Sequence, residues 1–133
     1  MAVCREFELD IENTIIPRIG FGFAGGIGNS GDVCGAVAGA VMAIGLKRER
    51  GETMEEAFHT LAVVQEFRRR FEKEMGTIHC RELTGADLTT AEGVEQFMRS
   101  DTPQTVCLPA VGAAYKLVVA VLKENSKSSS QHH

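Results

Sequence analysis

Apolar residues recur at helical spacing along almost the whole chain, and no other feature of the sequence constrains the fold as strongly. Runs in which polar and apolar residues alternate, as they do in half-buried strands, are absent, and β-branched residues seldom cluster. The sequence therefore predicts an all-α fold. Because 133 residues is close to the usual size of one domain, we expect a compact single-domain helical bundle.

The segment 53–75 has the clearest helical pattern. Thr53 followed by Glu56 has the spacing of a capping box, and Gly76 is a typical C-terminal stop. Between them, an apolar stripe is formed by Ala57, Leu61, Val64, Phe67 and Phe71. The same reasoning predicts helices over residues 3–9, 13–23, 32–46, 79–83, 89–99 and 109–123, with Pro17 in the first turn of the second.

The composition is that of an ordinary globular domain, with 44% hydrophobic and 24% charged residues. We predict one helical domain over residues 1–124 and a flexible polar tail over 125–133, whose two final histidines are consistent with an expression-tag remnant. A chain of this length buries roughly two thirds of its unfolded surface, so it needs neither disulfides nor a structural metal to fold. Its four cysteines therefore need another explanation.

Charge and hydropathy exclude several classes of partner. The net charge is -4 and the one basic run, 68–70, is flanked by glutamates, so we expect no nucleic acid. The N-terminus lacks the pattern of a signal or transit peptide, which favours a cytoplasmic location. The apolar stretch 33–46 is shorter than the about 20 residues of a membrane span, so we interpret it as a buried core helix and expect no span. In a reducing cytosol, cysteines favour catalysis, sensing or metal binding.

Cys34 is the most informative residue, because it follows a glycine-rich loop, FAGGIGNSGD at 23–32, and falls where a helix is predicted to start. Ser30 and Asp32 are candidate N-caps of this helix. Unpaired backbone N–H groups and the positive end of the helix dipole stabilise a thiolate at such a position. A small buried cysteine is the alternative. The spacing of Gly35, Gly39 and Ala43 by four residues predicts a face that packs against another helix.

The other cysteines have less distinctive settings. Cys107 lies just ahead of the predicted last helix, so its thiol is also expected near a helix N-terminus, and Cys80 adjoins His79 and Arg81, either of which favours a thiolate if its side chain folds back. Cys4 lies on a predicted short helix near the start of the chain. No pair has CxxC spacing, so any site must be assembled by the fold, and the pairing of the thiols stays open.

Other catalytic machinery is missing from the sequence. The glycine loop contains no GxxxxGK[ST] motif and follows no predicted strand, which excludes a P-loop or a Rossmann fold. Neither a GxSxG elbow nor an HExxH helix occurs, and no pair of acidic residues stands out as a general acid and base. Hydrolytic and nucleotide-binding functions are therefore not expected.

Residues 34–39 spell CGAxxG, with FAGGIGNSGDV before them and AVMAIGL after them. This pattern resembles the four-cysteine CGAxxG family of redox-active proteins, also called C_GCAxxG_C_C. The likeness extends over about residues 16–122, and the segments with Cys80 and Cys107 are similar to the family's third and fourth cysteine segments. The resemblance implies that Cys34, Cys80 and Cys107 are the functional candidates. Cys4 is similar to the family's first cysteine only in its order.

Three functional hypotheses follow. In the first, a thiol-disulfide oxidoreductase without a cofactor, Cys34 is the nucleophile and Cys80 or Cys107 resolves it by forming a disulfide. The second is a zinc or iron-sulfur protein, whose candidate ligands are Cys34, Cys80 and Cys107 with Cys4 or His79 as the fourth. The third is a non-enzymatic helical interaction protein.

The first two hypotheses predict that Cys34 lies near Cys80, Cys107 or both. The sequence does not identify the redox partner, which is either a protein or a small molecule, and it leaves a homo-oligomer open.

Overall fold

The computed structural model describes residues 2–10, 14–49 and 51–130, and their side chains up to residue 125. Within these ranges the protein is all-α, as predicted, and its extended backbone pairs only at one isolated antiparallel bridge between Val33 and His79. The helices are α1 (Ala2–Glu6), α2 (Ile15–Gly20), α3 (Gly35–Arg48), α4 (Met54–Met75), α5 (Cys80–Thr84), α6 (Ala91–Arg99) and α7 (Leu108–Ser130). A 3₁₀ turn, η1 (Phe21–Phe23), follows α2, and a π-helical turn, η2 (Pro103–Cys107), precedes α7.

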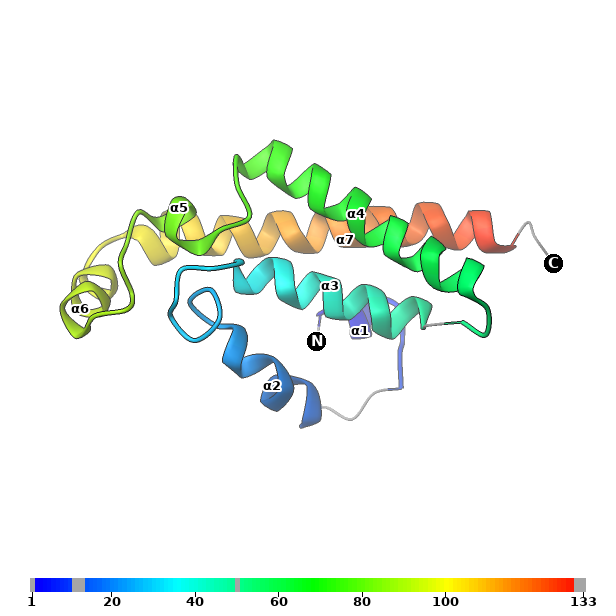
Figure 1. The fold of residues 1–133 in the computed structure, drawn as a ribbon, viewed down its shortest axis with the longest axis horizontal. Coiled ribbons are helices and arrows are strands. Elements are labelled where there is room, and N and C mark those ends of the chain that lie inside the picture. The colour runs from blue at the N-terminus through cyan, green and yellow to red at the C-terminus, as the bar shows by residue number, and fades with distance from the viewer. Residues whose placement is uncertain (1, 11–13, 50, 131–133) are drawn as a thin grey trace.

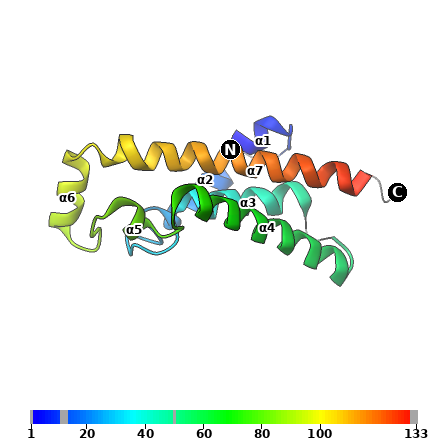
Figure 2. The ribbon, with the colours of Figure 1, turned by 90° about the horizontal axis from the view of Figure 1, so that it is seen from above.

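Three long helices form the body of the molecule. The helix α7 runs along its long axis, and α3 and α4 pack against α7 and against each other (Figures 1 and 2). The short helix α1 packs on α3 and α7, while α5 and α6 gather at the end where α7 begins. The core lies where the three long helices meet. Its fully buried side chains are Ile44, Phe67, Phe71, Val118, Val121 and Leu122.

Local sequence signals set the ends of α4 as predicted. Thr53 Oγ1 accepts the backbone N–H of Glu56 at 3.1 Å and the Glu56 carboxylate accepts that of Thr53, which completes the capping box. Gly76 ends the helix in the left-handed conformation at φ 90°. The predicted stripe is wrong at one position, because Leu61 is 57% exposed whereas Val63 is buried. Leu61 lies roughly 120° around the helix from Phe67, at 100° per residue, so both cannot face the core.

The CGAxxG helix, α3, begins at Gly35, two residues later than a cap at Asp32 would place it. Its N-cap is Cys34, so the prediction of Ser30 or Asp32 as the cap is wrong. Val37, Ala40, Ala43 and Ile44 are buried. The predicted small face is only partly correct, because a Cβ added at Gly39 would meet no atom within 4 Å. Gly39 instead lines a second cavity of about 400 Å³ between α1, α2, α3 and α7.

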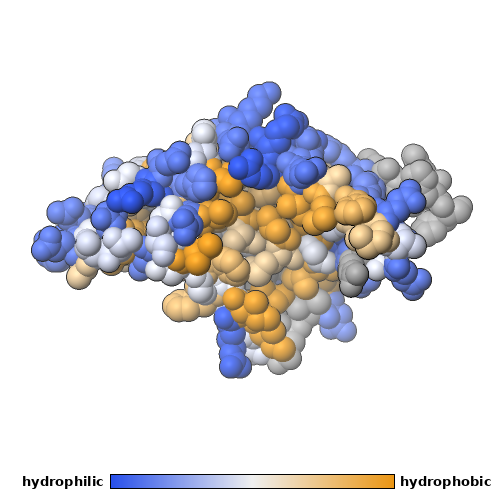
Figure 3. Space-filling model, viewed as in Figure 1, coloured by the Kyte–Doolittle hydropathy of each residue, from blue (hydrophilic) through white to orange (hydrophobic). Residues whose placement is uncertain are grey.

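Apolar side chains also reach the surface. Ile19 and Phe21, at the end of α2 and in η1, are 63% and 80% exposed. Figure 3 shows apolar side chains gathered across the middle and lower part of this face, whereas hydrophilic ones lie along the upper edge, where α4 runs. The helix α2 therefore covers α3 incompletely and leaves the second cavity beneath it.

The last helix, α7, begins at Leu108, which confirms the predicted start near Pro109, but the helical turn of η2 runs into it without a break. Pro109 has no N–H to donate to the carbonyl four residues earlier, and the chain widens into a π turn just before it. At the other end, α7 continues to Ser130, so no helix end marks the predicted boundary between domain and tail. Residues 131–133 lie outside the described residues.

Among the described residues, the helical stretch Pro103–Asn125 is long and apolar enough to cross a membrane. Its most apolar window has a mean hydropathy of 1.9, and 28% of that window is buried in the molecule. This stretch is longer than the apolar segment 33–46 on which the expectation of no span rests. Because core helices of soluble proteins meet the same criterion, length and composition do not by themselves place α7 in a membrane.

Candidate functional site: a three-cysteine cavity

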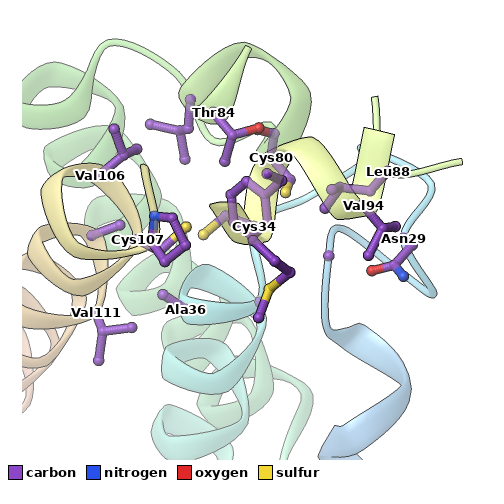
Figure 4. Close-up of a pocket in the computed structure, with 17 residues that line it drawn as sticks. Asn29, Cys34, Ala36, Cys80, Thr84, Leu88, Val94, Val106, Cys107 and Val111 are labelled. Carbon is purple, nitrogen blue, oxygen red and sulfur yellow. The ribbon is translucent and has the colours of Figure 1, made fainter. Parts of the chain in front are cut away.

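A cavity of about 420 Å³ lies at the end of the molecule where α3 starts and α5, α6 and η2 meet. Cys34, Cys80 and Cys107 all line it, and their sulfur atoms gather around its centre (Figure 4). All three are free thiols. We call this space the three-cysteine cavity. The prediction that Cys34 lies near Cys80, Cys107 or both is therefore confirmed.

A short piece of paired backbone holds Cys34 and Cys80 together. Val33 pairs with His79 in the antiparallel bridge, so each cysteine immediately follows one partner of this pair. The N–H of Cys34 donates to the carbonyl of Ile78 at 2.7 Å, and the N–H of Cys80 donates to the carbonyl of Asp32 at 2.7 Å. These bonds join two segments that lie far apart in the sequence.

The glycine loop fits closely around this bridge. Gly26 is buried and has a φ of +72°, and a Cβ added there would lie 2.8 Å from the Cβ of Cys80. Gly31 approaches the Cβ of Arg81 in the same way, at 2.9 Å. Only glycine combines a positive φ with such a close approach. The glycines thus provide a tight turn that packs on the Cys80 segment.

The helical turn η2 brings Cys107 to the cavity from the opposite side. It packs against α5, and Leu108 closes the turn by donating its N–H to the carbonyl of Pro103. Cys107 therefore lies inside a continuous helical run. The expectation that its thiol lies near a free helix N-terminus is wrong for this reason.

Electrostatics distinguishes the thiols. Burial raises the pKa of the Cys80 thiol above its usual value, negative charge on Cys34 and Cys107 raises it further, and a hydrogen bond from Thr84 partly opposes the shift. Burial also raises the pKa of Cys107, and negative charge on Cys34 adds to this. The expectation that Arg81 or His79 promotes a thiolate on Cys80 is not supported, because Arg81 pairs with Asp87 at 3.7 Å and His79 is exposed.

The cavity wall is apolar apart from the thiols and two polar side chains, Asn29 and Thr84. Much of it comes from α6, through Val94, Phe97 and Met98. The sequence predicts a helix over residues 89–99, but no pattern in it links this helix to the cysteines. The signal that could have linked α6 to the site is its pronounced apolar face. In the described structure none of its residues is completely buried, so this face remains partly open.

The remaining candidate ligands lie elsewhere. Cys4 is buried on α1 and lines the second cavity, whereas His79 is exposed and does not line the three-cysteine cavity. In the part of the chain that the structure describes, no group of three or more His, Cys, Asp or Glu side chains is arranged to hold a metal ion. The ligand set inferred from the sequence for zinc or an iron-sulfur cluster is therefore not assembled there.

The arrangement of the three thiols suits thiol-disulfide exchange. Three thiols that share one cavity can exchange with a disulfide and can pair with one another. Cys34 and Cys107 are half-buried, so they are more open to a reactant than Cys80, which is 9% exposed.

Comparison with known proteins agrees with this picture. Residues 1–121 match a family model described as "Putative redox-active protein (C_GCAxxG_C_C)". No curated protein and no solved structure matches the chain significantly.

Proposed function

Since the chain belongs to the C_GCAxxG_C_C family of redox-active proteins, we propose that it is a thiol-disulfide oxidoreductase whose dithiol is Cys34 and Cys107. The observation that carries the proposal is the gathering of three free thiols in one cavity, contributed by three separate segments of the chain. Cys80, the third thiol, lines the same cavity and is not part of the reacting pair.

Cys34 is the nucleophile in this proposal. As the N-cap of α3 it lies beside the first turn, whose backbone N–H groups have no partners within the helix and favour negative charge. Its side chain makes no capping hydrogen bond and is half-buried, so its sulfur is available to a reactant in the cavity. Cys80 is less suitable, because it is buried and packed against Gly26.

Cys107 is the resolving thiol. Its sulfur and that of Cys34 point toward each other in Figure 4, and both side chains are half-buried. Because its pKa is raised, chiefly by burial, Cys107 is held as the neutral thiol before reaction. Once Cys34 has formed a mixed disulfide, it no longer carries a negative charge. One of the two causes that raise the pKa of Cys107 is then removed. Cys107 thus becomes easier to ionise when it is needed.

The reduction of a substrate disulfide takes place in two exchange steps. The Cys34 thiolate attacks a substrate disulfide RS–SR, forms the Cys34–SR bond and releases RS⁻. The Cys107 sulfur then attacks Cys34, forms the Cys34–Cys107 disulfide and expels the second RS group, which takes the Cys107 proton and leaves as RSH. The substrate gains two electrons and the dithiol loses two. A reducing thiol in the cell returns the protein to its dithiol form by the reverse exchange.

Anaerobic protein treated with one equivalent of a disulfide tests this mechanism. Non-reducing peptide mapping by mass spectrometry is expected to find Cys34 linked to Cys107. In Cys107→Ser the mixed disulfide on Cys34 should persist, because its resolving thiol is missing, and in Cys34→Ser no internal disulfide should form.

Cys4→Ser is the matched control, because Cys4 lines the other cavity, and it should react as the unchanged protein does. A Cys34→Ser protein that still forms a disulfide with Cys107 would contradict the assignment of the nucleophile. Metal content is measured on the same preparation, and stoichiometric zinc or iron bound by these cysteines would overturn the dithiol mechanism.

A further inference from the structure

The three-cysteine cavity contains no charged side chain. Among the described residues that line it there is no Lys, Arg, His, Asp or Glu, and the polar side chains other than the thiols are Asn29 and Thr84. Arg81, which follows Cys80 in the chain, is paired with Asp87, and both lie outside the lining. A molecule in this cavity therefore contacts thiols, apolar side chains and two neutral polar side chains.

The cavity is too large to be a packing defect. Protein interiors hold few voids larger than a water molecule, whereas ligand sites usually measure about 300–1,000 Å³. At about 420 Å³ the three-cysteine cavity falls within that range. One wall is formed by α6, whose Phe97 is half-buried and whose Met98 is 68% exposed, so the lining extends from the interior to the surface.

We propose that the substrate of the dithiol is a small, uncharged, apolar disulfide that enters the cavity against Phe97 and Met98. This inference rests on the proposed function. An anionic disulfide is disfavoured, because its carboxylates would lose their hydration without gaining a cationic partner, and an unpaired buried charge is costly. An apolar disulfide gains from burial against the α6 wall. The substrate takes two electrons from the Cys34 and Cys107 dithiol and leaves as one thiolate and one thiol.

Two disulfide reagents that differ in charge test the proposal. The first, 4,4′-dipyridyl disulfide, is uncharged, whereas 5,5′-dithiobis(2-nitrobenzoate) carries two carboxylates, and each releases a product whose absorbance reports the reaction. Each rate constant with the Cys4→Ser protein is divided by the rate constant of the same reagent with 2-mercaptoethanol, which removes intrinsic reactivity. The normalised rate is expected to be at least about tenfold higher for the uncharged reagent, a ratio equal to about 1.4 kcal/mol.

A charge placed at the cavity mouth gives a second readout. Met98→Lys introduces a cation at an exposed lining position and should shift the preference toward the anionic reagent by roughly fivefold at low salt, as expected for an exposed ion pair. Phe58→Lys is the matched control, because Phe58 is 61% exposed on α4 and does not line this cavity, and the preference should not change.

Equal normalised rates for the two reagents, or equal effects of the two lysines, would overturn the substrate class. Peptide mapping of the products separates this failure from failure of the proposed function. A Cys34–Cys107 disulfide formed without selectivity leaves the oxidoreductase standing and removes the apolar substrate. If no such disulfide forms with either reagent, the proposed function fails and the inference that rests on it fails too.

Discussion

Gly26 illustrates how single residues set the geometry of the site. A Cβ added there would lie 2.8 Å from the Cβ of Cys80 and 2.6 Å from the backbone of Asp32, and its φ of +72° is a conformation that residues with a Cβ rarely adopt. Gly28, two residues later, has a similar φ of +61°, but a Cβ there would meet no atom within 4 Å. Both glycines have a positive φ, but only at Gly26 would an added side chain collide with other residues.

Gly26→Ala is expected to lower the free energy of unfolding by about 2–3 kcal/mol, from the strained φ together with the clash against Asp32 and Cys80. Gly28→Ala should cost about 1 kcal/mol, from the strained φ alone. Denaturant unfolding of both variants measures the difference. Equal losses would show that the contact with the Cys80 segment contributes nothing.

Among the elements, α4 and α7 are joined by an ion-pair network in which Glu66 of α4 binds Arg70, and Arg70 binds Glu124 of α7. Glu66 accepts hydrogen bonds from Arg69 at 2.6 Å and Arg70 at 2.8 Å, and Arg70 also donates to Glu124 of α7 at 2.8 Å. The hydrogen bonds from Arg69 and then Arg70 lower the pKa of Glu66 to about 2. The network is largely exposed, so its contribution at neutral pH is modest.

This pKa gives a prediction for acid stability. The unfolded chain protonates Glu66 near pH 4.5 and the folded protein only near pH 2, so the stability that the ionised carboxylate contributes is present above pH 4.5 and is lost as the pH falls toward 2. Glu66→Gln should therefore lower stability above pH 4.5, and its difference from the unchanged protein should vanish near pH 2. Thermal unfolding across this range measures it, with Glu74→Gln on the same helix as the control. A difference that does not vary with pH would contradict the prediction.

The second cavity gives a test of how α3 packs. Gly39 lies in the middle of the helix with open space where a side chain would extend, whereas at Gly35 a Cβ would lie 3.3 Å from the carbonyl oxygen of Phe23. Gly39→Ala is expected to raise the free energy of unfolding by about 0.5–1 kcal/mol, because alanine restricts the unfolded chain and fits the open space. Gly35→Ala should gain less. Destabilisation by Gly39→Ala, measured by denaturant unfolding, would mean that another helix covers this face.

On the scale of the whole molecule, α7 organises both the core and the cavities. One of its faces packs against α3 and α4 through Val118, Val121 and Leu122. Apolar positions elsewhere on the helix, such as Leu108 and Val111, are exposed, and Val111 lines both the three-cysteine cavity and the second cavity. A helix that is apolar on nearly all sides thus supplies core contacts on one side and cavity walls on another.

The core itself is expected to dominate stability. Phe67 is completely buried, and its ring lies 6.1 Å from that of Phe71. Phe67→Ala should lower the free energy of unfolding by about 3–5 kcal/mol through lost burial and the space left behind. Phe58→Ala, on the exposed side of the same helix, should change it by less than about 0.5 kcal/mol. Chemical denaturation of both variants decides, and similar effects would show that α4 does not bury the face described here.

Features that depend on residues near one another in the chain can be predicted from the sequence. The capping box at Thr53 and the stop at Gly76 set the ends of α4, because both act within one turn of the helix. The CGAxxG pattern is enough to indicate the family, and its resemblance points to Cys34, Cys80 and Cys107 as the functional candidates.

The surroundings of those residues, in contrast, depend on contacts between segments that lie far apart in the sequence. The bridge between Val33 and His79 joins segments that no short-range pattern relates, and it is this pairing that places Cys34 beside Cys80. The open space at Gly39 and the contribution of α6 to the cavity wall likewise depend on where other helices come to lie. Helical periodicity shows that a face is apolar, but its partner is set by the packing of the whole chain.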